Sequence, residues 1–188
     1  VWTKKAIKEA KFYGEVEVIA SSEDKNFSYI PKGYTIPEDL DYFYICSNNT
    51  IYGTEYKEDI DSPVPMIADM SSDILSRPID VSKYAMIYGG AQKNLAPAGL
   101  TIVIVRKDLL GHAMPGIPMM LDWKIQADND SMKNTPPCWC IYILGLVCDW
   151  LQEQGGLAGI QKINEMKAQM LYDTLEQTGI FICHAQKD

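Results

Sequence analysis

The sequence has 188 residues, of which 47% are hydrophobic and 22% are charged, and its formal net charge is -8 at pH 7. This length allows one domain, or one domain and part of a second, and the composition is ordinary for a globular protein. The acidic balance argues against non-specific nucleic-acid binding, which needs clustered Lys and Arg. It still allows a local cationic pocket that binds a small anion.

The five cysteines favour reduced thiols in a cytoplasmic protein, because their number is odd and their spacings fit no disulfide framework. We expect no metal site. Cys138 and Cys140 are better explained as small packed hydrophobes, since His112 and His184 are the only histidines and no second Cys pair has ligand spacing. The longest apolar run, residues 138–148, is too short to span a bilayer, and the N-terminus has no signal-peptide pattern.

The first part of the chain predicts a helix followed by short buried strands. Residues 3–13 are rich in Ala and Lys and end at Gly14, which predicts a helix. Residues 16–20 are β-rich, and residues 21–41 predict a loop with some helix near 37–40. Four short apolar bursts without clean polar alternation follow, which is typical of strands buried on both faces of an α/β sheet. These bursts are residues 42–46, 66–70, 85–88 and 100–105.

The second part of the chain is expected to be mainly helical. After a helical turn at 106–111, residues 112–137 predict a long loop, which is usually functional at this length. Residues 138–154 predict an apolar helix closed by a glycine pair, and residues 157–178 predict a long amphipathic helix. Residues 180–183 are expected to start another strand.

We expect a large domain over residues 1–153 and the beginning of a smaller one over 154–188. The strand predicted near the C-terminus would have nothing after it to pair with. Both ends of the chain are therefore expected to be cut from a longer protein.

Two residues are candidates for chemistry. Lys93 lies in a turn of small residues, 89–94, where a backbone can approach a ligand closely. A lysine held there out of bulk water could form a Schiff base with an aldehyde cofactor; the alternative is a solvated loop lysine. Asp69 ends the second buried strand, where open α/β sheets bind ligands, and it could pair with the nitrogen of a pyridine ring. The alternative is a turn Asp that caps a helix.

Polar and aromatic side chains elsewhere could assist a cofactor. Thr50 follows the first buried strand in the segment 46–50, where Asx and Ser/Thr turns are the alternative explanation. Asn134 and Thr135 precede a proline pair and could donate to a phosphate, although the prolines mainly set a rigid helix entry. Trp2 could stack on a pyridine ring, or could be an ordinary core or surface residue.

In their order along the chain, these motifs resemble the phosphoserine aminotransferase family of fold-type-I pyridoxal-phosphate enzymes. The resemblance extends from Trp2 to about Cys183. It implies an α/β fold, namely the second half of the large cofactor-binding domain plus the start of an α+β small domain. The motifs that carry it are Asn49-Thr50-Ile51-Tyr52-Gly53, Ala68-Asp69-Met70-Ser71-Ser72-Asp73, Gly90-Ala91-Gln92-Lys93-Asn94 and Asn134-Thr135-Pro136-Pro137.

The resemblance implies a role for each matching residue. Lys93 would bind pyridoxal 5'-phosphate covalently and shuttle the proton, and Asp69 would pair with the pyridine nitrogen. Trp2 would stack on the ring, Thr50 would hydrogen-bond the cofactor, and Gln92 would contact the phosphate.

The same resemblance implies a homodimer in which Asn134 and Thr135 reach the phosphate bound by the other subunit. The implied reaction transfers an amino group from L-glutamate to 3-phosphohydroxypyruvate, giving O-phospho-L-serine and 2-oxoglutarate in serine biosynthesis. Two alternatives remain. One is another fold-type-I enzyme, such as a cysteine desulfurase, and the other is a truncated, non-catalytic product that dimerises with a full-length subunit.

Several features of the family are missing from this sequence. Ala96 stands where a glycine is expected, and no glycine-rich loop of the kind that binds the cofactor phosphate is present. The substrates carry carboxylates and a phosphate, which favour bidentate Arg contacts, yet Arg77 and Arg106 are the only arginines. We therefore expect the chain alone to be inactive.

Overall fold

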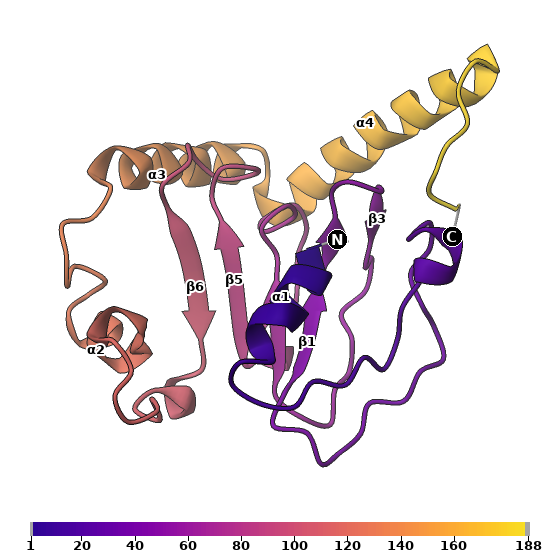
Figure 1. Cartoon of the computed structure of the whole chain (residues 1–188). Coiled ribbons are helices and arrows are strands. Elements are labelled where there is room, and N and C mark those ends of the chain that lie inside the picture. The colour runs from indigo at the N-terminus through magenta and orange to yellow at the C-terminus, as the bar shows by residue number, and fades with distance from the viewer. Residues whose placement is uncertain (1, 187–188) are drawn as a thin grey trace.

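A four-stranded mixed sheet forms the centre of the computed structural model, which describes residues 2–186 (Figure 1). The spatial order is β1-β4-β5-β6, with β1, β4 and β5 parallel and β6 antiparallel to β5. Each strand coincides with one of the four predicted apolar bursts, so the α/β fold class is confirmed. The strands are β1 (Phe43–Cys46), β4 (Met66–Asp69), β5 (Met86–Gly90) and β6 (Thr101–Val105).

The two faces of this sheet are buried to different extents. Met66 and Ile87 are 1% exposed and Ala68 is fully buried, and they belong to the main hydrophobic core. Tyr44, Asp69 and their neighbours on the opposite face are only half-buried. The prediction of strands buried evenly on both faces is therefore wrong for β1, β4 and β5, along which burial alternates.

Helices and short turns surround the sheet (Figure 1). Helix α1 lies against β1, and α3 crosses the end of the sheet where β5 ends and β6 begins. There the Cys140 thiol lies 3.4 Å from the carbonyl oxygen of Ala98. The α-helices are α1 (Trp2–Ala10), α2 (Trp123–Asp128), α3 (Cys138–Glu153) and α4 (Gly156–Thr178). The 3-10 helices are Glu23–Lys25, Val81–Lys83, Lys107–Leu109 and Met119–Leu121.

The turn between α3 and α4 depends on glycine. Gly155 adopts a left-handed conformation with φ of 88°, which a residue with a Cβ rarely adopts. A Cβ on Gly159 would lie 2.0 Å from the carbonyl oxygen of Gln154, an impossible contact. Leu151 and Ile160 are buried next to this turn, whereas the far half of α4 extends away from the sheet and is exposed (Figure 1).

Four parts of the sequence prediction need correction. Residues 37–40 form no helix, and the β-rich run 16–20 forms no strand. The predicted loop 112–137 contains α2 and a 3-10 helix. Residues 180–183 form no strand, and Ile182 is 99% exposed, because no neighbouring strand is available to pair with them.

The tail and one small hairpin were not foreseen. His184 Nε2 lies 2.8 Å from the carbonyl oxygen of Asn26, so the tail folds back onto the loop near the N-terminus. A two-stranded hairpin pairs β2 (Asn48–Asn49) with β3 (Thr54–Glu55). No helix in residues 2–186 is long and apolar enough to cross a membrane.

Candidate functional site

The carboxyl ends of the parallel strands gather the candidate residues at one edge of the sheet. Cys46 pairs in register with Asp69, and Asp69 pairs with Tyr88. A cavity of about 140 Å³ opens at this edge, which is where open α/β sheets bind ligands. The cavity is lined by Trp2, Cys46, Asn48, Asp69, Ser71, Ser72, Gln92 and Lys93.

Lys93 follows β5 in a tight turn, in which Ala91 accepts a hydrogen bond from the amide of Leu95. Its Nζ donates to Thr50 Oγ1 at 2.8 Å and lies 5.4 Å from the centre of the Trp2 ring. Lys93 is nevertheless exposed, so the expected shielding from water is not present in this chain. Its two neighbours are themselves open to solvent, because Trp2 is 38% exposed and Thr50 is exposed as well.

Asp69 is held by one carboxylate oxygen. Its Oδ1 accepts from the amide of Ser71 at 2.9 Å and from the Ser71 hydroxyl at 2.6 Å. That hydroxyl in turn accepts from the amide of Gly90 at 3.1 Å, which joins the ends of β4 and β5. Asp69 thus stabilises the turn after β4 and also faces the cavity, but it caps no helix, because the next helical element begins at Val81. Among residues 2–186 no cation forms an ion pair with it.

Half-buried neutral groups lie on either side of Asp69. Burial raises the pKa of the Cys46 thiol to about 11, so the thiol is protonated at neutral pH. Burial also raises the pKa of both Tyr44 and Tyr88, whose hydroxyl oxygens lie 3.0 Å apart. The sequence analysis missed both tyrosines. Alternation along β1 places Tyr44 on the same face as Cys46, but the register of β1, β4 and β5 is needed to bring either tyrosine to the face of Asp69.

A second carboxylate ties the segment after β4 to the end of β1. Ser47 is buried, and its hydroxyl donates to Asp73 Oδ1 at 2.6 Å. Burial raises the pKa of Asp73, and the hydrogen bond from Ser47 opposes that shift. This contact supports the cavity wall from behind.

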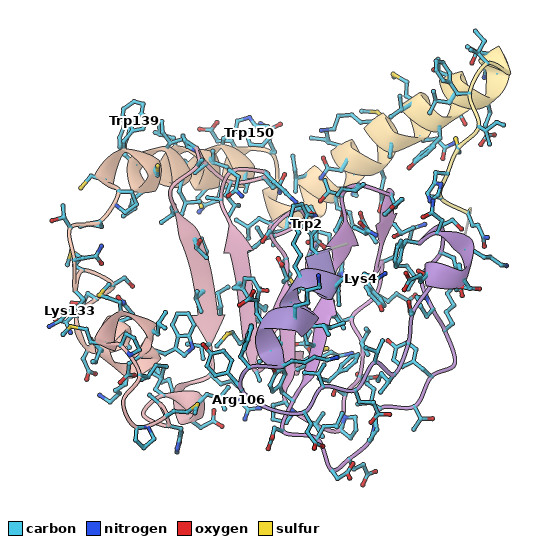
Figure 2. The ribbon with its side chains drawn as sticks, viewed as in Figure 1. Trp2, Lys4, Arg106, Lys133, Trp139 and Trp150 are labelled. Carbon is cyan, nitrogen blue, oxygen red and sulfur yellow. The ribbon has the colours of Figure 1, made fainter. Side chains whose placement is uncertain are left out.

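Asn134 and Thr135 lie outside the cavity. Both are exposed in the segment before α3. Their neighbour Lys133 and the cavity residue Trp2 lie well apart in Figure 2. The structure therefore brings together Trp2 and the other predicted site residues, namely Thr50, Asp69, Gln92 and Lys93, but does not bring Asn134 and Thr135 to them.

Neither arginine reaches the site. Arg77 forms an ion pair with Asp59 at 3.2 Å, in which both side chains are largely buried. Arg106 pairs with Asp108 at 2.7 Å. A larger hollow of about 440 Å³ lies at the other end of β4, lined in part by Arg106 and Lys83. Because Lys83 is already paired with Asp61 at 2.7 Å, the cations of this hollow are neutralised by neighbouring carboxylates.

The fold and the cavity define an α/β protein with a lysine and a carboxylate at the ends of adjacent parallel strands. A comparison with protein families matches residues 5–188 to the family described as aminotransferase class V. The chain belongs to the class-V aminotransferase family.

Individual relatives agree with this assignment. The chain is 56% identical, over all of its 188 residues, to the phosphoserine aminotransferase of Bacteroides thetaiotaomicron, and covers 53% of that protein. It is 57% identical over 182 residues to the Listeria monocytogenes enzyme of the same name, covering 96% of this chain and 50% of that protein. The chain thus spans about half the length of the curated relatives it matches.

A solved structure gives the same result for the fold. A phosphoserine aminotransferase studied for radiation damage of its Schiff base superimposes with a TM-score of 0.95 at 46% identity. The superposition covers 100% of this chain and 53% of the solved phosphoserine aminotransferase chain.

Proposed function

We propose that this chain is part of a pyridoxal-phosphate-dependent phosphoserine aminotransferase. The enzyme would transfer an amino group between L-glutamate and 3-phosphohydroxypyruvate, giving O-phospho-L-serine and 2-oxoglutarate in serine biosynthesis. The observation that carries the proposal is the placement of Lys93 and Asp69 on adjacent strand ends around one cavity. The identity of 56% to a phosphoserine aminotransferase supports the choice of reaction.

The residues around the cavity fit the ring of pyridoxal phosphate. Lys93 supplies a primary amine for covalent attachment, and Trp2 supplies a flat indole beside it. Asp69 has one oxygen held by Ser71, which leaves the other free to accept the proton of a ring nitrogen. When bound, the cofactor supplies an electron sink for the substrate's α-carbon.

The residues of the chain have separate tasks in this scheme. Asp69 keeps the ring nitrogen protonated, because an ionised carboxylate stabilises the adjacent positive charge. Lys93 Nζ carries a proton to and from the substrate. Thr50 holds that amine by a hydrogen bond of 2.8 Å, which limits its positions before reaction.

The phosphate end of the cofactor needs additional donors. Gln92 lines the cavity and would contact the phosphate from the same subunit. We assign Asn134 and Thr135 to the phosphate of the partner subunit in a homodimer. Support comes from exposed apolar side chains in the same segment, which would be buried by a partner. They are Met119, Met120, Leu121 and Trp123.

Domain division and location follow from the same proposal. Residues 1–153 would belong to the large domain, and residues 154–188 would begin the small one. The glycine-dependent turn at Gly155 supports this boundary. The five unpaired cysteines support a reducing, cytoplasmic location.

Borohydride reduction of the cofactor-loaded, full-length enzyme tests the proposal. Reduction fixes a Schiff base as a stable secondary amine, and peptide mapping then locates it. We expect the label on Lys93, and we expect Lys93→Ala to abolish both labelling and transamination of phosphoserine with 2-oxoglutarate. Lys83→Ala is the matched control, because Lys83 is paired with Asp61 far from the cavity. A label on another lysine would refute the assignment.

A further inference from the structure

A pair of tyrosine hydroxyls lies beside Asp69. The register of β4 and β5 makes Tyr88 the direct neighbour of Asp69, on the face of the sheet that bears the cavity. The hydroxyl oxygen of Tyr88 lies 3.0 Å from that of Tyr44, on β1. The two phenols therefore bridge over β4, which lies between β1 and β5.

Either hydroxyl can be the donor in the Tyr44–Tyr88 contact. Burial raises the pKa of both phenols, so each carries its proton at neutral pH. The Asp69 carboxylate also raises the pKa of Tyr88, as expected of a negative charge on the neighbouring strand. A Tyr88 proton turned toward the carboxylate leaves the Tyr88 oxygen free to accept from Tyr44.

Several of the other groups near Asp69 are engaged elsewhere. Its Oδ1 is already bound by Ser71. The Cys46 thiol lies 3.4 Å from the carbonyl oxygen of Asn48, to which it donates. The Lys93 amine donates to Thr50. The nearby carboxyl of Asp73 accepts from Ser47 and donates nothing when ionised. Tyr88, the register neighbour of Asp69 on β5, is the phenol placed to serve the free side of the carboxylate.

We propose that Tyr88, supported by Tyr44, is a positioning residue for Asp69. Its hydroxyl stabilises the ionised carboxylate and keeps it turned toward the ring nitrogen of the cofactor. The inference rests on the proposed function, because it assigns a task at the same site. A donor to a carboxylate lowers its affinity for a proton. Without the hydroxyl, Asp69 would draw the shared proton away from the ring nitrogen.

The test removes one tyrosine hydroxyl at a time and measures whether the ring nitrogen of the cofactor is protonated. The holoenzyme is loaded with pyridoxal phosphate labelled with ¹⁵N in the ring, whose chemical shift separates a protonated from a neutral ring nitrogen. Tyr88→Phe is expected to move this shift toward the neutral value, and Tyr44→Phe is expected to move it less in the same direction. Turnover should fall about tenfold in Tyr88→Phe, as for the loss of one hydrogen bond to a charged group.

Tyr84→Phe is the matched control. Tyr84 is a buried tyrosine whose hydroxyl donates to Asp59 at 3.0 Å, far from the cavity. This substitution removes the same kind of bond, so it should lower the melting temperature without moving the ¹⁵N shift. If Tyr88→Phe also leaves the shift unchanged, Tyr88 is merely structural and the inference is overturned. Should Tyr88→Phe fail to fold, an unchanged shift in Tyr44→Phe overturns it equally.

The two proposals fail in different ways. If the unmodified holoenzyme gives no borohydride-stable link at Lys93, the proposed function is wrong and this inference falls with it. If the link forms at Lys93 but neither tyrosine substitution changes the ¹⁵N chemical shift of the ring nitrogen, the proposed function stands and only the role of Tyr88 is wrong.

Discussion

Asp69 combines a fixed position with an unpaired charge. One oxygen is held by Ser71, while the carboxylate forms no ion pair among the described residues 2–186. A carboxylate in that state is costly to leave without a cation, and a protonated ring nitrogen supplies one. The same residue therefore serves both the local turn and the chemistry at the cavity.

Replacing Asp69 by Asn tests this role in the cofactor-loaded enzyme. The amide keeps the shape and can still accept from Ser71, but it cannot hold the ring nitrogen protonated. We expect cofactor binding to persist and turnover to fall by roughly a hundredfold or more, as for other preorganised electrostatic contacts. Asp61→Asn, at an exposed ion pair, should retain activity. Near-normal turnover of Asp69→Asn would remove Asp69 from the mechanism.

Asp73 predicts a pH dependence of stability. Burial raises its pKa in the folded state above the unfolded value of about 3.9. Ionised Asp73 therefore costs stability, and the cost develops as the pH rises from the unfolded pKa through the raised folded one. Asp73→Asn keeps an oxygen that accepts from Ser47, so it should raise the urea midpoint at pH 7 and change it little near pH 3.

Asp80 provides the control of opposite sign. Its pKa is lowered because Ser82 donates to it through its hydroxyl and its amide. Ionised Asp80 therefore favours the folded state above the unfolded pKa, and this contribution is lost as the pH falls through the lowered one. Asp80→Asn should lower the urea midpoint at pH 7. If both substitutions shift the midpoint in the same direction, burial does not control the charge of Asp73.

Strand β5 connects the core to the turn that carries Lys93. Ile87 is 1% exposed on this strand, and it pairs in register with Ile104 of β6, which is 43% exposed. We expect Ile87→Ala to lower the free energy of unfolding by about 2–5 kcal/mol, through lost burial and a cavity. Ile104→Ala removes the same atoms from a wetter position and should cost about 1 kcal/mol or less. Equal losses in denaturant unfolding would mean that the position on β5 is no better buried than its partner on the edge strand β6.

The sequence was sufficient for the elements whose signals are local. Each strand of the main sheet is a short apolar burst between turn residues; Asp69 ends one of them, and Lys93 lies in the turn after another. The carboxyl ends of parallel strands meet at one edge, so the strand assignment was enough to place both residues together. Helices α3 and α4 were predicted equally well, from their apolar patterns and from the glycine turn between them.

Features that depend on distant residues were not predictable in this way. The Tyr44–Tyr88 pair joins residues of non-consecutive strands, and it requires the register of β1, β4 and β5. Helix α2 has only six residues, and its start depends on Asp122, whose side chain accepts from the amide of Lys124. Residues 180–183 have high β propensity, but propensity forms no strand without a neighbour to pair with.

The molecule as a whole leaves large apolar side chains uncovered. Figure 2 shows Trp139 and Trp150 on α3 pointing away from the sheet. The far half of α4 exposes Met166, Met170 and Leu171 as well. Contiguous apolar surface of this kind marks an interface or a liability to aggregate. Because the chain spans about half the length of its curated relatives, we expect these surfaces to be covered in the complete enzyme.

The 188-residue chain by itself should show no transaminase activity. Lys93 and Asp69 line the cavity, so covalent attachment of the cofactor is chemically possible. The cofactor phosphate, however, would meet only Gln92 and the Lys93 turn, and no arginine lines the cavity to bind two carboxylates and a phosphate. The exposed apolar side chains should also make the isolated chain self-associate, visible by light scattering.

The assay uses purified chain with pyridoxal phosphate, phosphoserine and 2-oxoglutarate. We expect no saturable formation of glutamate and only weak, nonspecific labelling by the cofactor aldehyde after borohydride reduction. Lys93→Ala is the control, because background transamination by free cofactor does not require this lysine. Saturable turnover that disappears in Lys93→Ala would contradict the prediction. It would mean that Gln92, together with a second copy's Asn134 and Thr135, is enough to hold the phosphate.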